Sequence, residues 1–547
     1  MRREPRRPFI AAATLGPVAI AILVGAALRF YRLGANSFWI DEFATLSLAT
    51  QAPGEILRTS STANFIPPLY FLLVHTVWQI LGESEVALRL PSVIAGICTI
   101  PIVWALTQNI TRSRSTADIT AALLAVNPLH LWYSQEARPY ALLLFFGCSA
   151  LLAFERAVHT KSGRDWGGFW LCSTLAILTH TTGVIFVAIA WAWGFWAAER
   201  QRVLRPLLTL SLAIGVTCAP FFLRIARVLE ETGGTFHSPP RAITGLEVGY
   251  SLLSYVTGYS FGPAPREIQN FGGLAALRAH PLESTVAVAA LLGLLAVSVA
   301  KRRATMRPFT ALLGISLGTI FFLAAFSGKA YNVRYTLPAL VGFLGIVSVA
   351  IAALAPRSRA LCLTALVGLA LWADAQWFWV PRYWKEDSRA AVGWLRSQLG
   401  PGARIAVAPV YYDKLLQYYS RKSGAELHFL PVLPESGFTT GASIDALVLT
   451  RLHHVPSWRE LKAGFLALHD CQVVEGHVSG YQMLVRPMTP SKSSYRNFPK
   501  PGGPLSNCGI NSLVASVFQP TMSTVQVCRI HQGCPGKPLL IGGPDWK

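Results

Sequence analysis

The first 380 residues contain a series of apolar segments, most of them close to the length that crosses a lipid bilayer. A helix needs about 20 apolar residues to span the hydrocarbon core, and the chain is 52% hydrophobic and only 14% charged. This composition excludes a water-soluble protein, so we predict an α-helical polytopic membrane protein. We interpret about eleven segments as transmembrane spans: 9–28, 86–107, 117–131, 138–157, 166–180, 182–198, 204–223, 283–300, 308–327, 333–354 and 359–380.

The net charge of +21 has its cause in the short loops between these segments, which collect lysine and arginine. In a soluble chain such a charge would suggest nucleic acid, but no basic and aromatic recognition module is present, and we expect no nucleic-acid partner. Positively charged loops stay on the cytoplasmic side. With eleven spans, the basic loops fall on one side of the membrane together with the arginine-rich N-terminus: 111–114, 158–165, 199–205, 301–307 and 355–359.

The apolar stretch 66–81 is the exception in this count. It begins with Pro67 and Pro68, is short, and contains His75 and Gln79. If it crossed the bilayer, the basic loop that follows the next span would lie outside. We therefore predict an interfacial helix on the outer surface.

Composition changes after residue 380. Residues 387–399 have helical periodicity, and the segments RIAVAP, DALVLT and YQMLVRP are typical of strands. We predict a transmembrane domain at 1–380 and an extracytoplasmic α/β domain at 381–487. Residues 488–547 are rich in Ser, Pro and Gly without periodicity, and we expect this tail to be disordered.

Two adjacent carboxylates, Asp41 and Glu42, follow the first span. They lie among aromatic residues such as Trp39 and Phe43, which are typical of the membrane–water interface. A carboxylate at this boundary can act as a general base. The alternative is an acidic first helical turn, capped by the preceding Asn-Ser pair.

Other polar residues stand at the outer ends of apolar segments. Taken singly, each has a structural alternative. Glu136 and Arg138 could form an ion pair at a helix boundary, and His180 could simply end a helix. Lys329 and Arg334 could extend their charged ends from an apolar segment to the membrane surface. Taken together with the acidic pair, they place a base and several cations along one rim. Fixed cations can hold a phosphate and stabilise its charge as a leaving group, so we predict an anionic lipid-linked substrate.

Four sequence blocks carry a resemblance to a known family. They are RFYRLG followed by FWIDE, PPLYFLLVH followed by LG-x-SE-x-ALRLPS (67–92), NPLHLWYSQEARPYALL (127–143) and VRYTLPAL (333–340). In this order they resemble the GT-C membrane glycosyltransferases, and most closely the bacterial branch that is similar to protein O-mannosyltransferases. The resemblance covers residues 10–380 and, loosely, the α/β domain.

The resemblance implies transfer of a sugar from a polyprenyl-phosphate carrier to an acceptor, with inversion at the anomeric carbon. The acceptor would be a protein, a lipid or a cell-envelope glycan. By position, Asp41 would be the general base with Glu42 beside it. Arg138 and Arg334 would face the donor phosphate, and Glu136 would be a second acidic contact.

Four further residues complete the candidate substrate-binding set: Tyr140, His180, Lys329 and Tyr335. We assign no metal ligand, because no C-x-x-C or similar cluster occurs, and the sequence leaves the need for a divalent metal open. The expected location is the bacterial cytoplasmic membrane, with the site facing the periplasm.

The chain departs from the family at Phe65 and Ile66. Relatives usually carry a histidine, or a Glu-Lys pair, just before Pro-Pro, so this departure leaves the donor sugar open and keeps a catalytically inactive member as an alternative. A transporter or flippase of lipid-linked sugars is the other alternative. It predicts internal repeats with broken helices in matching positions, and the sequence shows no such pairing.

Overall fold

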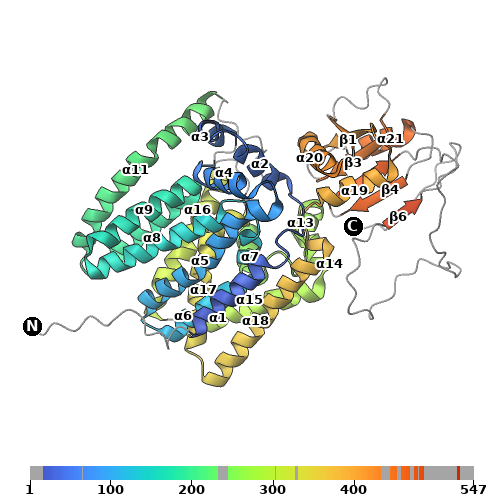
Figure 1. Cartoon of the computed structure of the whole chain (residues 1–547). Helices are drawn as coiled ribbons and strands as arrows, with labels where there is room; N and C mark the ends of the chain where they lie inside the picture. The colour runs from blue at the N-terminus through green and yellow to red at the C-terminus, as the bar shows by residue number, and fades with distance from the viewer. Residues whose placement is uncertain are drawn as a thin grey trace, which may run out of the picture. The chain divides into compact units, whose positions relative to one another are not determined.

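A computed structural model describes the chain at residues 16–63, 66–231, 244–301, 303–326, 331–432, 444–451, 458–468, 474–478, 480–485 and 526–529. The chain forms two compact units (Figure 1). The first unit is made of residues 1–36 and 41–383, and the second of residues 37–40 and 384–547.

The first unit is helical. Its helices in chain order are α1 (Gly16–Phe30), α2 (Ile40–Ala49), α3 (Pro53–Ala63), α4 (Leu69–Leu81), α5 (Glu85–Thr111), α6 (Arg114–Ala125), α7 (Pro128–Ser134), α8 (Tyr140–Thr160), α9 (Gly163–Thr179), α10 (Val184–Trp196), α11 (Arg200–Glu231), α12 (Leu246–Thr257), α13 (Pro265–Phe271), α14 (Gly273–Ala279), α15 (Pro281–Ala300), α16 (Arg307–Phe326), α17 (Leu337–Ala352) and α18 (Pro356–Trp379).

Seven of the described helices are long and apolar enough to cross a membrane: α5, α8, α11, α15, α16, α17 and α18. The predicted fold class, a polytopic α-helical membrane protein with a C-terminal α/β domain, is therefore confirmed. The other four predicted spans coincide with shorter helices, namely α1, α6 with α7, α9 and α10. The count of eleven spans stays a prediction.

The span predicted at 117–131 is divided in the structure between α6 and α7. The side-chain oxygen of Asn127 accepts the N–H of His130 at 3.0 Å and so caps α7, and Pro128 occupies the first helical position, where its missing N–H costs nothing. Helix α7 is followed by a short turn at residues 135–139 that leads into α8. We call this segment the α7–α8 turn.

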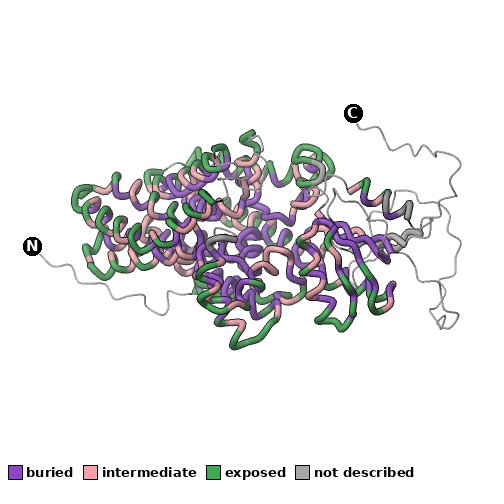
Figure 2. The backbone as a smooth tube through the Cα atoms, turned by 90° about the horizontal axis from the view of Figure 1, so that it is seen from above, coloured by how far each residue is buried: buried purple, intermediate pink, exposed green. Residues whose placement is uncertain are grey.

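Buried residues concentrate in the interior of the helical unit (Figure 2). Helix α17 is buried over most of its length. Small residues allow α16 and α17 to approach closely. A Cβ added to Gly342 would lie 2.6 Å from the backbone of α16, and one added to Gly345 would lie 2.2 Å from the Phe309 ring. Such glycines are the usual means of close helix contact in a membrane.

Helix α4 carries the segment predicted to be interfacial. With 13 residues it is shorter than the seven span candidates. Tyr70 and His75 are buried against the rest of the unit: the Tyr70 hydroxyl lies 2.8 Å from the Ser92 hydroxyl, and His75 Nδ1 lies 2.7 Å from the Ala49 carbonyl. The orientation of α4 in a membrane stays a prediction.

The second unit is a small α/β domain. Its strands are β1 (Arg404–Ala408), β2 (His428–Pro431), β3 (Ala446–Thr450), β4 (Val474–Val478), β5 (Tyr481–Val485) and β6 (Gln526–Arg529), in the sheet order β2-β1-β3-β5-β4-β6. Strand β1 is parallel to β2 and β3, and the other pairs are antiparallel. The helices are α19 (Ser388–Gln398), α20 (Asp413–Ser423) and α21 (Trp458–Leu468).

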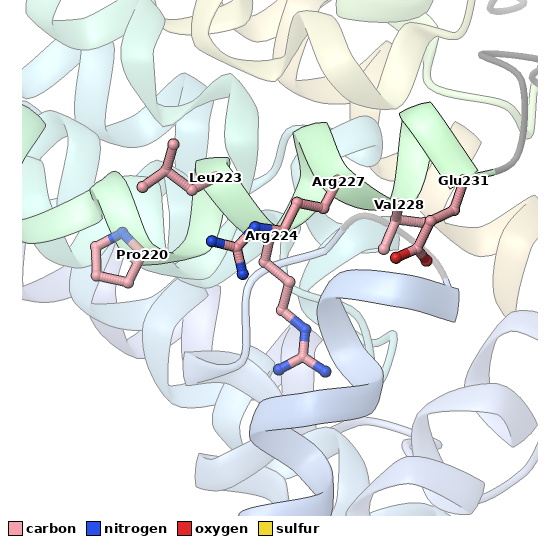
Figure 3. A pocket seen from close by; sticks show the side chains of 6 residues that line it. All are labelled: Pro220, Leu223, Arg224, Arg227, Val228 and Glu231. Atoms are coloured by element: carbon pink, nitrogen blue, oxygen red, sulfur yellow. The ribbon is translucent and has the colours of Figure 1, made fainter.

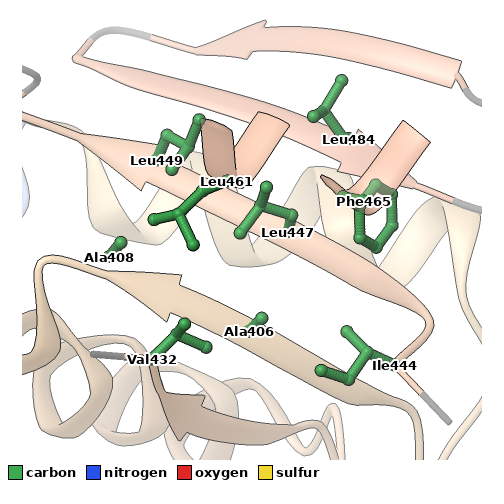
Figure 4. Close-up of a cluster of buried hydrophobic side chains, with 9 residues drawn as sticks. All are labelled: Ala406, Ala408, Val432, Ile444, Leu447, Leu449, Leu461, Phe465 and Leu484. Carbon is green, nitrogen blue, oxygen red and sulfur yellow. The ribbon is translucent and has the colours of Figure 1, made fainter. Parts of the chain in front are cut away.

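Alternate positions of β1, β3 and β5 supply the apolar core beneath α21. Leu447 and Leu449 of β3 point toward Leu461 and Phe465 of α21 (Figure 4). The three segments predicted to be strands correspond to β1, β3 and β5. Residues 526–529, which form β6, belong to the tail that we predicted to be disordered; its other residues lie outside the described part of the chain, and the prediction for them stays a prediction.

Residues 37–40 belong to the second unit although they precede Asp41 in sequence. The Phe38 N–H donates to the Tyr419 hydroxyl at 2.7 Å, and Phe38 is fully buried. The Trp39 ring lies within 4.7 Å of the Lys385 ammonium and 5.4 Å of the Arg451 guanidinium. The second unit thus holds the four residues that lead into the acidic pair.

Candidate active site

The two neighbouring acids of α2 have different surroundings. Glu42 is fully buried and forms a two-pronged ion pair with Arg89 of α5. Arg89 Nε donates to Oε1 and Arg89 Nη2 donates to Oε2, both at 2.8 Å. The N–H of Ala137 in the α7–α8 turn also donates to Oε1, at 2.8 Å. Glu42 therefore ties α2 to α5 and to the turn.

Asp41 keeps 27% of its side chain exposed. Its Oδ2 accepts a hydrogen bond from Arg334 Nη1 at 2.8 Å. Its backbone carbonyl accepts one from Arg138 Nη1 at 3.1 Å, and the same nitrogen lies 3.3 Å from the Thr45 hydroxyl. Asp41 is thus the accessible member of the acidic pair, with two guanidinium groups beside it.

Arg138 is held by the backbone of the α7–α8 turn. Its N–H donates to the Glu136 carbonyl at 2.7 Å, and its own carbonyl accepts from the Ser92 hydroxyl at 3.0 Å. The side chain is 95% buried, and Nε has no hydrogen-bond partner among the described residues. A buried guanidinium N–H without a partner is costly, which favours a bound anion at this position.

Arg334 comes from a short 3₁₀ turn, Val333–Thr336, that precedes α17. Asn332 caps this turn by accepting the Arg334 N–H at 3.1 Å. The guanidinium lies 5.8 Å from the Tyr140 ring and 5.2 Å from the Tyr335 ring. Its Nε, like that of Arg138, is buried without a hydrogen-bond partner in the part of the chain that the structure describes.

Aromatic rings surround these arginines. The His180 ring lies 5.6 Å from both the Tyr140 ring and the Tyr335 ring, and the Tyr133 ring lies 5.3 Å from that of Tyr140. His180 Nδ1 lies 2.8 Å from the Thr182 hydroxyl. The structure therefore gathers Tyr140, His180 and Tyr335 from separate sequence blocks around Arg334.

The other residues singled out from the sequence are Glu136, Lys329, Phe65 and Ile66, and the structure describes only two of them. Glu136 lies in the α7–α8 turn and is 99% buried. Lys329 lies outside the described residues, as does Phe65, whereas Ile66 is buried. Arg89 and Tyr133 were not among the residues predicted from the sequence. Arg89 stands in the ALRLPS block that carried the resemblance, so an arginine in an apolar segment was the available signal for it.

No group of three or more His, Cys, Asp or Glu side chains is arranged to hold a metal ion among the described residues. A cavity of about 560 Å³ lies elsewhere, along the end of α11, and its lining contains none of the candidate residues. Figure 3 shows this lining, which consists of Pro220, Leu223, Arg224, Arg227, Val228 and Glu231.

Residues 66–223 match the family model described as dolichyl-phosphate-mannose-protein mannosyltransferase. A protein of Aquifex aeolicus, described as an uncharacterized protein, is 27% identical over 169 residues. That match covers 30% of this chain and 33% of the Aquifex protein, so the chain matches about a third of the length of this relative.

Two solved structures of ArnT from Cupriavidus metallidurans share the fold. The apo structure has a TM-score of 0.52 at 14% identity, and the structure bound to undecaprenyl phosphate has 0.51 at 13% identity. Each comparison covers 87% of this chain and 98% of ArnT. Identities this low establish the fold alone. The archaeal oligosaccharyltransferase AglB from Archaeoglobus fulgidus reaches a TM-score of 0.48 at 15% identity, over 88% of this chain and 75% of that one.

The family match falls on the two central sequence blocks, and the shared fold extends over both units of the chain. The resemblance predicted from the sequence is confirmed at this level: residues 66–223 are similar to the dolichyl-phosphate-mannose-protein mannosyltransferase family, and the chain shares the fold of ArnT.

Proposed function

We propose that the protein transfers a sugar from a polyprenyl-phosphate-linked donor to an acceptor at the outer face of the bacterial cytoplasmic membrane. The observation that carries this proposal is the pair of guanidinium groups beside Asp41. Arg138 and Arg334 each keep a buried Nε without a hydrogen-bond partner among the described residues. A phosphate offers several oxygens that would satisfy these donors.

In the proposed reaction Asp41 is the general base. The acceptor hydroxyl gives its proton to the Asp41 carboxylate while its oxygen attacks the anomeric carbon. The bond from that carbon to the phosphate oxygen breaks, and polyprenyl phosphate leaves as an anion. A single displacement of this kind inverts the anomeric centre. Arg138 and Arg334 stabilise the charge that develops on the phosphate.

Glu42 has a different part in the proposal. Both of its oxygens accept hydrogen bonds from Arg89, and Oε1 also accepts from the backbone of the α7–α8 turn. A carboxylate in this arrangement is a poor proton acceptor, because protonation would break a buried ion pair. We therefore assign Glu42 as a positioning residue that fixes Asp41 and the turn.

The aromatic residues around Arg334 complete the donor site in this proposal. Tyr140 and Tyr335 hold the guanidinium through their ring faces, and His180 packs on both rings. The ArnT structure bound to undecaprenyl phosphate supports a lipid phosphate as the donor carrier, because it has the same fold. The one-sided basic loops support an outward-facing site.

Mass spectrometry of envelope glycans and of lipid-linked sugars tests the proposal. Cells with the wild-type protein should carry a glycan that is missing both without the protein and with Asp41→Asn. The donor should accumulate in the two deficient strains. Identical glycans and donor pools in all three strains would overturn the proposal, and would favour the inactive alternative. The same comparison names the sugar and the acceptor.

A further inference from the structure

The cavity of about 560 Å³ at the end of α11 contains none of the candidate active-site residues. Its described lining recurs every three or four residues along the helix, so the lining belongs to one face of α11. The charged members of this lining are Arg224, Arg227 and Glu231. Figure 3 shows both guanidinium groups extending away from the ribbon of α11. A volume of this size is sufficient for a small ligand or for the headgroup of a lipid.

The two arginines of the cavity are unpaired within the described part of the chain. Neither guanidinium forms a hydrogen bond or an ion pair there, although Glu231 follows Arg227 by four residues. By contrast, Arg202 at the other end of α11 forms an ion pair with Glu199. Two arginines and one glutamate leave the lining with one net positive charge. That charge matches the single negative charge of a phosphodiester, whose oxygens accept hydrogen bonds from guanidinium groups.

An exposed apolar stripe leads along α11 to these arginines. Leu212, Val216 and Leu223 are 63%, 75% and 60% exposed. The successive intervals from Leu212 through Val216 and Leu223 to Arg227 are four, seven and four residues, which places all four side chains on one face of the helix. Only 17% of the most apolar part of α11 is buried, the smallest share among the seven described span candidates. We therefore expect this face to contact lipid.

The length of the stripe fits the acyl chains of a phospholipid. Val216 and Arg227 are eleven residues apart, which is roughly 16 Å along the helix axis. One leaflet of the hydrocarbon core is about 15 Å deep. A lipid with its phosphate at Arg227 would therefore place its acyl chains along Leu223 and Val216. In the predicted topology this end of α11 lies outside, so the lipid would come from the outer leaflet.

We propose that the cavity at the end of α11 binds the phosphate of an anionic phospholipid, with the acyl chains on the apolar stripe. A single arginine at the end of a span can extend to the membrane surface without a particular lipid. Here two neighbouring unpaired guanidinium groups share a cavity at the end of an apolar stripe. The inference is independent of the proposed function, because the lining contains neither Arg138 nor Arg334.

Native mass spectrometry of the purified full chain tests the proposal by measuring lipid affinities. Phosphatidylglycerol, which is anionic, should bind more tightly than phosphatidylethanolamine, which is zwitterionic. The double variant Arg224→Gln/Arg227→Gln should bind phosphatidylglycerol about tenfold more weakly or worse, because it loses two charge-assisted hydrogen-bond donors. Equal affinity for the two phospholipids, or the same affinity for phosphatidylglycerol in the double variant and the wild type, would overturn the proposal.

The matched control is the double variant Arg396→Gln/Arg421→Gln. It removes the same charge from two exposed positions of the second unit, and the affinity for phosphatidylglycerol should stay at the wild-type value. A loss equal to that in Arg224→Gln/Arg227→Gln would show an effect of net charge alone and would count against a site. Thermal unfolding of both lipid-free variants should match the wild type, because these arginines are not buried.

Two further measurements separate the phospholipid from the donor and from effects on folding. The affinity for undecaprenyl phosphate should be the same in Arg224→Gln/Arg227→Gln and the wild type. A matching loss for this lipid would assign the cavity to the donor and overturn the phospholipid assignment. In the wild-type protein, phosphatidylglycerol with a photoreactive headgroup should label residues 220–231. Labelling confined to other segments would contradict the proposal without the use of any variant.

Discussion

Neutralising Glu42 should mainly reduce the stability of the protein, whereas neutralising its neighbour Asp41 should mainly reduce the rate of transfer. In Glu42→Gln, the side chain keeps one carbonyl oxygen but gains an NH₂ group. Arg89 donates to both oxygens of the carboxylate, so in the variant at least one donor of Arg89 meets another donor. The substitution also leaves the Arg89 charge buried without its partner, because the two side chains are only 5% and 1% exposed.

The size of the effect follows from this burial. Removing one member of a buried ion pair typically costs about 3–5 kcal/mol, which is a large part of the roughly 5–15 kcal/mol that stabilises a folded domain. The Asp41–Arg334 pair is more exposed, at 27% and 24%, and a pair of that kind contributes about 1 kcal/mol or less. Asp41→Asn should therefore leave the fold nearly intact.

Activity should show the reverse order. Asp41→Asn keeps the shape of the side chain but removes the proton acceptor, and general-base catalysis contributes about 10²–10⁴-fold in rate. Glu42→Gln should lower the amount of folded protein and its unfolding temperature, with a smaller loss of rate for each folded molecule. The assay is transfer from a radiolabelled polyprenyl-phosphate sugar, normalised to folded protein by fluorescence-detected gel filtration.

Two results would refute this reasoning. Full transfer by the Asp41→Asn protein would end its assignment as the base and move the role to Glu42 or Glu136. A Glu42→Gln protein with a normal unfolding temperature but no turnover would show that Glu42 itself takes the proton.

Three further predictions follow from the site and the sequence. Arg138→Ala should raise the KM for the donor and lower kcat together, since this guanidinium is expected to hold the phosphate in the ground state and in the transition state; kinetics with an unchanged KM would contradict donor contact. Cysteine labelling should place Trp394 on the outer side and Arg302 on the cytoplasmic side, and labelling of both from one side would overturn the predicted topology. Deletion of residues 490–547 should leave insertion and transfer nearly unchanged, and loss of transfer at normal protein levels would count against that expectation.

Apolar length and the side on which basic loops fall were enough to predict the helical membrane unit. They could not define every helix. The division of the span predicted at 117–131 depends on one local signal, Asn127 followed by Pro128, which is easily overlooked inside an apolar segment. In the second unit, β2 was missed because the sequence HFLP, with a histidine and a proline in four residues, lacks the continuous apolar run that marks β1 and β3.

The candidate site shows the same limit at the level of side chains. Asp41, Arg138 and Arg334 were chosen because each is a charged residue at the outer end of an apolar segment. In the structure both arginines donate hydrogen bonds to Asp41, Arg138 to its backbone carbonyl and Arg334 to its carboxylate. The partner of Glu42 could not be chosen in this way. Arg89 is 47 residues away and stands in an apolar segment where periodicity indicates only a buried helix.

The difference between the two acids is therefore a property of the fold. Asp41 and Glu42 are consecutive on α2, so their side chains point in directions about 100° apart around the helix axis. One direction meets Arg89 and the backbone of the α7–α8 turn, and the other meets Arg334 at the partly exposed edge of the unit. The sequence predicts an acidic pair at a membrane boundary. Only the contacts of Glu42 with Arg89 of α5 and of Asp41 with Arg334, in the turn before α17, assign one carboxylate to structure and leave the other for chemistry.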